Sequence, residues 1–269
     1  MGRMIKRLTL VVLLALAAAL PARAMTQEDV VSARMLPGWR TASGSYMTAL
    51  ELTLAPDWKT YWRSPGDAGI PPLFDWSGSE NLASVRFHWP RPHVFTINGL
   101  QSIGYKHQLV LPIELVPQDP SRPIRLHATV DLGVCRDICM PASLSVQADL
   151  SGQGAPDAAI NAALDARPST EAEAGMGRIG CTVDPTPDGL RLSARIALPP
   201  TGGVETVVFE PGDGVWSSSA VVTRDGGTLI ATTDLVSNTD APIALNRHAI
   251  IVTVLGSNRA VEISGCPAP

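Results

Sequence analysis

An alternation of apolar and polar residues with a period of two is the feature that most constrains how this chain folds. Apolar side chains of one parity run through residues 46–54, 124–132, 142–150 and 190–198, with more polar side chains between them. This period is typical of β-strands with one buried face, whereas helices repeat every 3.6 residues. Glycine and proline separate many such short segments. The pattern predicts an all-β chain built from two immunoglobulin-like antiparallel β-sandwiches.

Composition divides the chain into two halves. Five of the six tryptophans and all three tyrosines lie between residues 39 and 105, whereas the second half is rich in glycine, threonine and valine. The stretch between them has the composition of a linker, and its middle is compatible with one short helix between Pro156 and Pro168. We therefore expect one sandwich over residues 25–150, a linker with a short helix over 151–177 and a second sandwich over 178–269.

The first 24 residues have the form of a secretory signal peptide. Three basic residues precede an apolar run from Leu8 to Leu20, and an A-x-A cleavage pattern ends at Ala24. The apolar run of about 13 residues is shorter than the roughly 20 that a membrane-spanning helix needs. We predict export with cleavage after Ala24 and no stable membrane insertion; an uncleaved N-terminal anchor is the alternative.

The net charge and the absence of certain catalytic motifs argue against several classes of partner and reaction. The predicted signal peptide holds four of the 21 basic residues and none of the 25 acidic ones, so the remaining chain carries a net charge of −8. This acidic excess argues against nucleic acid or an anionic membrane as a partner. A hydrolase is poorly supported, because the sequence lacks the G-x-S-x-G, Walker and H-E-x-x-H motifs.

The four cysteines form two very different candidate pairs. In an exported chain, cysteines are expected to form disulfides or to carry redox chemistry. Cys181 and Cys266 open and close the second half, and a bridge between them would close a loop of about 86 residues, worth roughly 4.6 kcal/mol. We expect this pair to be a structural disulfide. Cys135 and Cys139 would close a loop of only about five residues, worth about 2 kcal/mol.

The spacing of Cys135 and Cys139 requires the chain to reverse between them. Along one strand their Cα atoms would lie about 13 Å apart, too far for a disulfide. Residues 136–138 have the length of a three-residue hairpin loop. Cys135 shares the parity of the polar residues 125–131, which predicts an outward sulfur that another protein's thiol reaches. A redox couple is favoured over an inert disulfide, and a Cu(I) site with Met140 is the metal alternative.

Three segments resemble a known family. The run from WKTYWRSPGDAGIPP through LVLPIEL to VDLGVCRDICMPA resembles the N-terminal periplasmic domain of DsbD thiol:disulfide interchange proteins, and most closely the branch associated with suppression of copper sensitivity. The resemblance covers about residues 35–150, and the two-sandwich layout with a second cysteine pair also looks like that branch. It implies a periplasmic thiol:disulfide oxidoreductase of the protein-disulfide reductase type, which needs no cofactor and relays electrons by mixed-disulfide exchange.

The resemblance also implies roles for particular residues. Cys135 and Cys139 match the redox pair, and Tyr61 and Trp62 lie where the family places aromatic residues beside it. Phe95 matches the phenylalanine of a cap loop that shields the cysteines until a partner displaces it. Tyr105 is expected to be a further neighbour of the pair. For each aromatic residue, ordinary core packing is the alternative.

Two departures from the family affect these expectations. The Cys-x-x-x-Cys spacing is shorter than in the best-known members, and the sequence contains neither a membrane domain nor a thioredoxin-like domain. The expected partners are therefore periplasmic thioredoxin-like proteins and a separate membrane electron donor. The competing function is a copper-binding or scaffold module of copper tolerance, in which Cys135, Cys139 and Met140 hold Cu(I).

Overall fold

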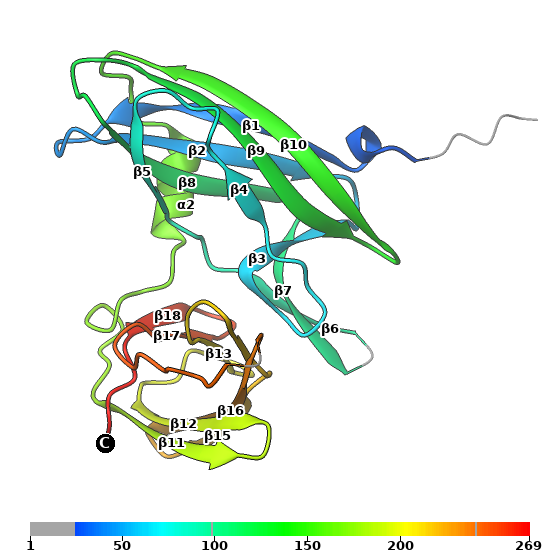
Figure 1. Ribbon diagram of the computed structural model, residues 1–269, viewed down its shortest axis with the longest axis vertical. Helices are drawn as coiled ribbons and strands as arrows, with labels where there is room; N and C mark the ends of the chain where they lie inside the picture. Colours follow the sequence, from blue (N-terminus) through cyan, green and yellow to red (C-terminus); the bar gives the residue numbers. More distant parts are fainter. Residues whose placement is uncertain (1–24, 98, 240) are drawn as a thin grey trace, which may run out of the picture.

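The computed structural model describes residues 25–97, 99–239 and 241–269, so the predicted signal peptide lies outside the described residues. Figure 1 shows two β-sandwiches, one formed by the blue to green part of the chain and one by the yellow to red part. The predicted all-β fold with one short helix is confirmed. Within the described ranges, no helix has the length and apolar character needed to cross a membrane.

The first sandwich consists of two antiparallel sheets. After a 3-10 turn, η1 (Gln27–Asp29), a four-stranded sheet is formed by β1 (Val31–Arg40), β2 (Tyr46–Leu54), β8 (Gln108–Pro117) and β5 (Leu82–Phe87), in that order. The six-stranded sheet has the order β10 (Cys139–Leu150), β9 (Ile124–Cys135), β3 (Lys59–Gly66), β7 (Leu100–Lys106) and β6 (His93–Ile97), and β4 (Leu73–Asp75) pairs with β9.

The predicted apolar rows form the core of this sandwich. The even-numbered residues of β9 and most of those of β10 are buried, while Arg125, His127 and Asp131 on the other face of β9 are exposed. Strand β2 is buried on both faces, and a helix packs against its outer side through Ile160. This helix, α2 (Ala158–Asp165), begins at Asp157, whose side chain accepts hydrogen bonds from two backbone amides of the first turn.

The second sandwich is smaller and is closed by a buried disulfide. Its larger sheet has the order β11 (Ile179–Thr186), β12 (Gly189–Ala197), β16 (Thr228–Ser237) and β14 (Val215–Ser217), with β15 (Val221–Asp225) also paired to β16. The other sheet contains β13 (Thr206–Glu210), β17 (Ile251–Leu255) and β18 (Ala260–Ser264). Cys181 on β11 is bonded to Cys266 just after β18, and both residues are 0% exposed.

The two sandwiches are in direct contact beside strand β3. Apolar residues of the second sandwich, among them Val208 and Leu255, join the hydrophobic cluster of the first. Arg63 on β3 forms ion pairs with Glu210 on β13 and Glu262 on β18, at 2.9 and 2.6 Å. Burial works against the charge of Arg63, but the two carboxylates raise the pKa of its guanidinium. The strand next to the cysteine hairpin is thereby fixed to the second sandwich.

Candidate functional site

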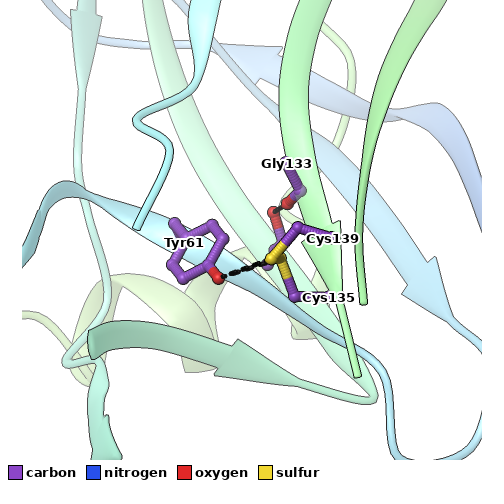
Figure 2. Close-up of a disulfide and its surroundings, with 5 residues drawn as sticks. Tyr61, Gly133, Cys135 and Cys139 are labelled. Carbon is purple, nitrogen blue, oxygen red and sulfur yellow. Dashed lines mark hydrogen bonds between the residues drawn. A yellow bond between two sulfur atoms is a disulfide. The ribbon is translucent and has the colours of Figure 1, made fainter. Parts of the chain in front are cut away.

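The Cys135–Cys139 pair lies at the end of the long hairpin of β9 and β10. The two cysteines are the last residues paired between these strands, and residues 136–138 form the turn. The amide of Arg136 donates a hydrogen bond to the carbonyl of Ile138 across this turn, at 3.0 Å. The reversal brings the two Cα atoms to 4.1 Å, and the sulfurs form a disulfide, drawn in Figure 2. The predicted three-residue hairpin loop is confirmed.

The two cysteines of this disulfide differ in exposure. Cys139 is exposed, whereas Cys135 is only 2% exposed. The prediction that Cys135 is openly accessible is therefore wrong, although it does share the parity of the polar residues of β9. Beyond Asp131 that face is covered, because the connection from β3 to β4 crosses it and places Ile70 against Gly133. An incoming thiol therefore meets Cys139 first.

Tyr61 on β3 completes the cover over Cys135. Its hydroxyl donates a hydrogen bond to Sγ of Cys135 at 2.9 Å and lies 3.6 Å from Sγ of Cys139, as Figure 2 shows. The ring is buried, and Gly69 packs closely against it. Burial raises the pKa of the Tyr61 hydroxyl, so it remains a neutral donor at physiological pH. One hydroxyl thus contacts both sulfur atoms.

Trp62 and Tyr105 lie on the other side of the sheet, in the core. Trp62 follows Tyr61 along β3, is 0% exposed and belongs to the main hydrophobic cluster. The ring of Tyr105 stacks on Trp89, and its hydroxyl donates a hydrogen bond to the carbonyl of Pro90 at 2.7 Å. Of the two neighbouring aromatic residues in TYWR, the structure therefore brings Tyr61 to the disulfide and places Trp62 away from it.

Two lysines extend the row of side chains that begins with the disulfide. In the strand register, Lys59 is the partner of Cys135 on one side and of Lys106 on the other. Residues directly opposite each other have side chains on the same face, so Cys139, Cys135, Lys59 and Lys106 form one row across the sheet. Lys59 is buried, and this burial, together with the charge of Lys106, lowers the pKa of its amine.

Phe95 lies over these two lysines, in strand β6. Nζ of Lys106 is 4.8 Å and Nζ of Lys59 is 5.3 Å from the centroid of its half-buried ring. The resemblance placed Phe95 in a cap loop; here it occupies the outer strand of the β6–β7 hairpin, which extends from the sandwich in Figure 1. The ring thus covers the two cations beside Cys135.

Sequence reasoning missed the two lysines, although a signal for them was present. Lys59 precedes Tyr61 by two residues and so has the same parity on a strand. The chain contains only three lysines, and Lys59 and Lys106 are the two outside the predicted signal peptide. The scarcity of lysine and the shared parity of Lys59 and Tyr61 were therefore the signal in the sequence, whereas only the structure shows that the two lysines are neighbours.

The side chains of Arg136 and Met140 are directed away from the two sulfurs of the disulfide. The guanidinium of Arg136 lies 5.5 Å from the centre of the Trp58 ring and also pairs with Asp137. Met140 is paired with Val134, in alternation with the cysteines, and packs against the hydrophobic core. Its side chain and the two sulfurs therefore lie on opposite faces of the sheet. In the ranges that the structure describes, no group of three His, Cys, Asp or Glu side chains has the geometry of a metal site.

The first sandwich matches a known family, and the whole chain matches a known fold. Residues 32–150 match the family model described as thiol:disulfide interchange protein DsbD, N-terminal. A comparison with curated proteins finds no match. Among solved structures, the chain is similar to the N-terminal periplasmic domain of ScsB from Proteus mirabilis, with a TM-score of 0.68 and 24% identity over 91% of this chain and 96% of that chain. The similarity in fold therefore extends over both sandwiches.

The family match includes the strands that build the candidate site. It extends from β1 to the end of β10 and so contains the cysteine hairpin, Tyr61 and both lysines. Residues 32–150 therefore form a domain that matches the family of DsbD N-terminal domains.

Proposed function

We propose that this protein is a periplasmic thiol:disulfide interchange module, exported by a signal peptide over residues 1–24. In this proposal the Cys135–Cys139 pair accepts electrons from a separate membrane donor and passes them to thioredoxin-like partner proteins. The main support is the unequal exposure of the two cysteines of this disulfide. Cys139 is exposed, whereas Cys135 is buried and accepts a hydrogen bond from the Tyr61 hydroxyl. The match of residues 32–150 to the DsbD N-terminal family model supports the same chemistry.

The unequal exposure suggests the order of bond changes during reduction. A donor thiolate attacks Sγ of Cys139, and a donor–Cys139 disulfide forms while the Cys135–Cys139 bond breaks. The electron pair of the broken bond leaves with Sγ of Cys135 as a thiolate, towards which the Tyr61 hydroxyl already points. A second donor thiolate then attacks the donor sulfur of the mixed disulfide. The donor leaves oxidised, and both cysteines of this domain are reduced.

Transfer to a partner runs through the same sulfur in reverse. The Cys139 thiolate attacks the partner's disulfide, and one partner sulfur leaves as a thiolate. Cys135 then attacks Sγ of Cys139, which restores the internal bridge and releases the partner with both its cysteines reduced. Cys139 therefore exchanges with other proteins, and Cys135 resolves the intermediate. Before Cys135 attacks, the Tyr61 hydroxyl donates a hydrogen bond to its sulfur.

Trapping a mixed disulfide tests this assignment. In the Cys135→Ser variant the resolving thiol is absent, so we expect a covalent complex with an oxidised periplasmic thioredoxin-like protein to accumulate through Cys139. The Cys139→Ser variant retains only the buried thiol and should yield at least tenfold less complex. Non-reducing electrophoresis followed by mass spectrometry of the linked peptides measures both.

The matched pair of single variants also defines what contradicts the proposal. Equal trapping by Cys139→Ser would contradict the order of attack. Absence of a complex in both variants, with no change in the redox state of the wild type on mixing, would reject interchange with thioredoxin-like proteins. The Cys181–Cys266 bridge is present in both variants and is 0% exposed, so it serves as the internal control.

A further inference from the structure

The two lysines beside the disulfide form a like-charged pair that is unfavourable for the sheet. Cross-strand pairs of like charge destabilise a sheet, yet Lys59 and Lys106 are direct partners on β3 and β7. In the part of the chain that the structure describes, neither lysine forms an ion pair with a carboxylate, although the chain has an excess of acidic residues. Burying an amine without a counter-charge is also unfavourable. This arrangement needs a compensating role.

The position of Lys59 relative to Cys135 provides such a role. Side chains directly opposite each other in a sheet have Cβ atoms about 4.5–5.5 Å apart. Lys59 has this relation to Cys135, and the low exposure of both residues limits screening by water. The ring of Phe95 lies against both amines, a geometry that favours their protonated form. A positive charge on this neighbouring side chain stabilises a thiolate at Cys135 more than a thiol or a disulfide.

We propose that Lys59, with Lys106 behind it, is a positioning residue whose positive charge stabilises the thiolate of Cys135. The role of this charge in exchange rests on the proposed function, because a stabilised thiolate is a better leaving group when a donor attacks Cys139. In that step the electron pair of the donor thiolate forms the new bond to Cys139, the Cys135–Cys139 bond breaks, and the electron pair of the broken bond leaves on Sγ of Cys135, whose neighbour across the strands is Lys59. No proton needs to be transferred to Cys135 for the bond to break.

Other titratable groups near Cys135 do not replace Lys59 in this role. Of the charged and titratable groups on the elements around Cys135, those nearest to it in the strand register are Asp131 (β9), Cys139 (β10), Lys59 and Tyr61 (β3), Lys106 (β7), His93 (β6), and Arg136 and Asp137 in the turn. Arg125 and His127 lie further along β9, and Arg63 on β3 is paired with the second sandwich. Arg136 is turned towards Trp58 and paired with Asp137. Burial, Arg91 and Lys106 lower the pKa of His93, so it is neutral where a thiol titrates. Asp131 lies roughly 13 Å away along β9.

The pKa of the Cys135 thiol tests the inference in the protein alone. In a Cys139→Ser background, Cys135 is the only free thiol, and the 13Cβ chemical shift of Cys135 reports its titration between pH 5 and 11. We expect a midpoint below the usual value of about 8.5. Adding Lys59→Gln should raise the midpoint by about one pH unit, and Lys59→Arg should keep it near that of the parent. Arg125→Gln removes one positive charge from the far end of the same face of β9 and should leave the midpoint unchanged.

A second lysine variant keeps the inference falsifiable if Lys59→Gln fails to fold. Lys106 is exposed and one strand further from Cys135, so Lys106→Gln should raise the midpoint in the same direction by about half as much. Midpoints that stay unchanged in both glutamine variants, or that fall, would overturn the inference. Trapping with Cys135→Ser is independent of this titration. Failure of the proposed function would therefore appear as a missing complex, and failure of the lysine inference as an unmoved midpoint.

Discussion

The two disulfides of this chain differ in the loops they close and in their access to solvent. Cys181 and Cys266 are 85 residues apart in sequence and are both 0% exposed, whereas Cys135 and Cys139 are four residues apart and include one exposed cysteine. A long loop gives a bridge its stabilising effect, because closing it restricts the unfolded chain most. Exposure gives a bridge its reactivity. Under the proposed function, the stabilising bridge and the reactive bridge thus lie in separate sandwiches.

The neighbours of the two bridges differ in the same way. Cys181 and Cys266 lie within the hydrophobic cluster of the second sandwich. The Cys135–Cys139 bridge lies in a row with two lysines and beneath a tyrosine hydroxyl, at the end of a hairpin. Apolar surroundings preserve a bond, whereas a hydrogen-bond donor and positive charge prepare its sulfurs to carry negative charge. The structure thus places one bridge in an apolar core and the other beside polar and positively charged side chains.

The largest predicted effect is the loss of stability when each bridge is removed. Replacing Cys181 and Cys266 with alanine should lower the free energy of unfolding by about 4–5 kcal/mol, against about 2 kcal/mol for alanine at Cys135 and Cys139. Urea denaturation of both double variants measures the difference. Similar losses of unfolding free energy in the two double variants would contradict the distinction drawn between the two bridges. Dithiothreitol added to the native wild type should reduce the exposed bridge first, which mass spectrometry after alkylation detects.

Removing the link between the sandwiches should have the next largest effect. The Arg63→Met variant keeps an apolar stem over the Trp62 ring but leaves Glu210 and Glu262 without their shared cation. Because hydrogen bonds to charged groups contribute about 1.5–3 kcal/mol, we expect a loss of about 2 kcal/mol and separate unfolding transitions for the two sandwiches. Calorimetry measures both.

A matched arginine on the surface provides the control for this link. The ion pair of Arg125 with Glu80 is exposed on both sides, so Arg125→Met should change the stability by less than about 0.5 kcal/mol. If Arg63→Met also changes the stability by less than about 0.5 kcal/mol, the ion pairs of Arg63 do not hold the two sandwiches together.

A smaller effect is expected on the reduction potential when the Tyr61 hydroxyl is removed. A hydrogen bond to a thiolate is stronger than one to a neutral disulfide sulfur, so Tyr61→Phe destabilises the reduced state. We expect the potential of the Cys135–Cys139 pair to fall by about 20 mV, the equivalent of about 1 kcal/mol. Equilibration with glutathione measures it. Tyr105→Phe removes a buried hydroxyl that contacts neither sulfur and should leave the potential unchanged; an equal shift in both variants would contradict the role of Tyr61.

The smallest effect is expected at Met140, which tests the copper alternative. Its side chain packs on the core side of β10, away from the sulfurs. Met140→Leu conserves volume and should change the stability by less than about 1.5 kcal/mol. An anaerobic Cu(I) titration of the reduced variant should match that of the wild type. Loss of copper binding as complete as in the Cys135→Ser/Cys139→Ser variant would mean that the reactive bridge is instead a metal site.

Local pattern predicted much of this structure. The alternation in β9 and β10 identified their buried faces, and the spacing of the cysteines required the turn that joins them. Both are properties of neighbouring residues, for which the two-residue period is sufficient. The short helix was predictable for the same reason, since Asp157 caps it and its buried residues follow helical spacing.

Long-range packing explains what the pattern did not predict. The parity of Cys135 was identified correctly, but its burial depends on Tyr61 and on the segment that carries Ile70, both distant in sequence. TYWR did not reveal which aromatic residue faces the disulfide, because Tyr61 and Trp62 are both large and apolar enough for a core. The partners of Arg63 are 147 and 199 residues away, and no local period relates them to β3.

The contact between Gly133 and Ile70 has a consequence for the course of exchange. A Cβ atom at position 133 would lie 2.9 Å from Cβ of Ile70, closer than real side chains approach one another. Any other residue there would push the β3–β4 connection, which carries Ile70, outward and admit solvent to Cys135. In the proposed exchange, a partner could then form its mixed disulfide with either cysteine. The hydrogen atom that glycine has in place of a side chain therefore confines the mixed disulfide of the proposed exchange to Cys139.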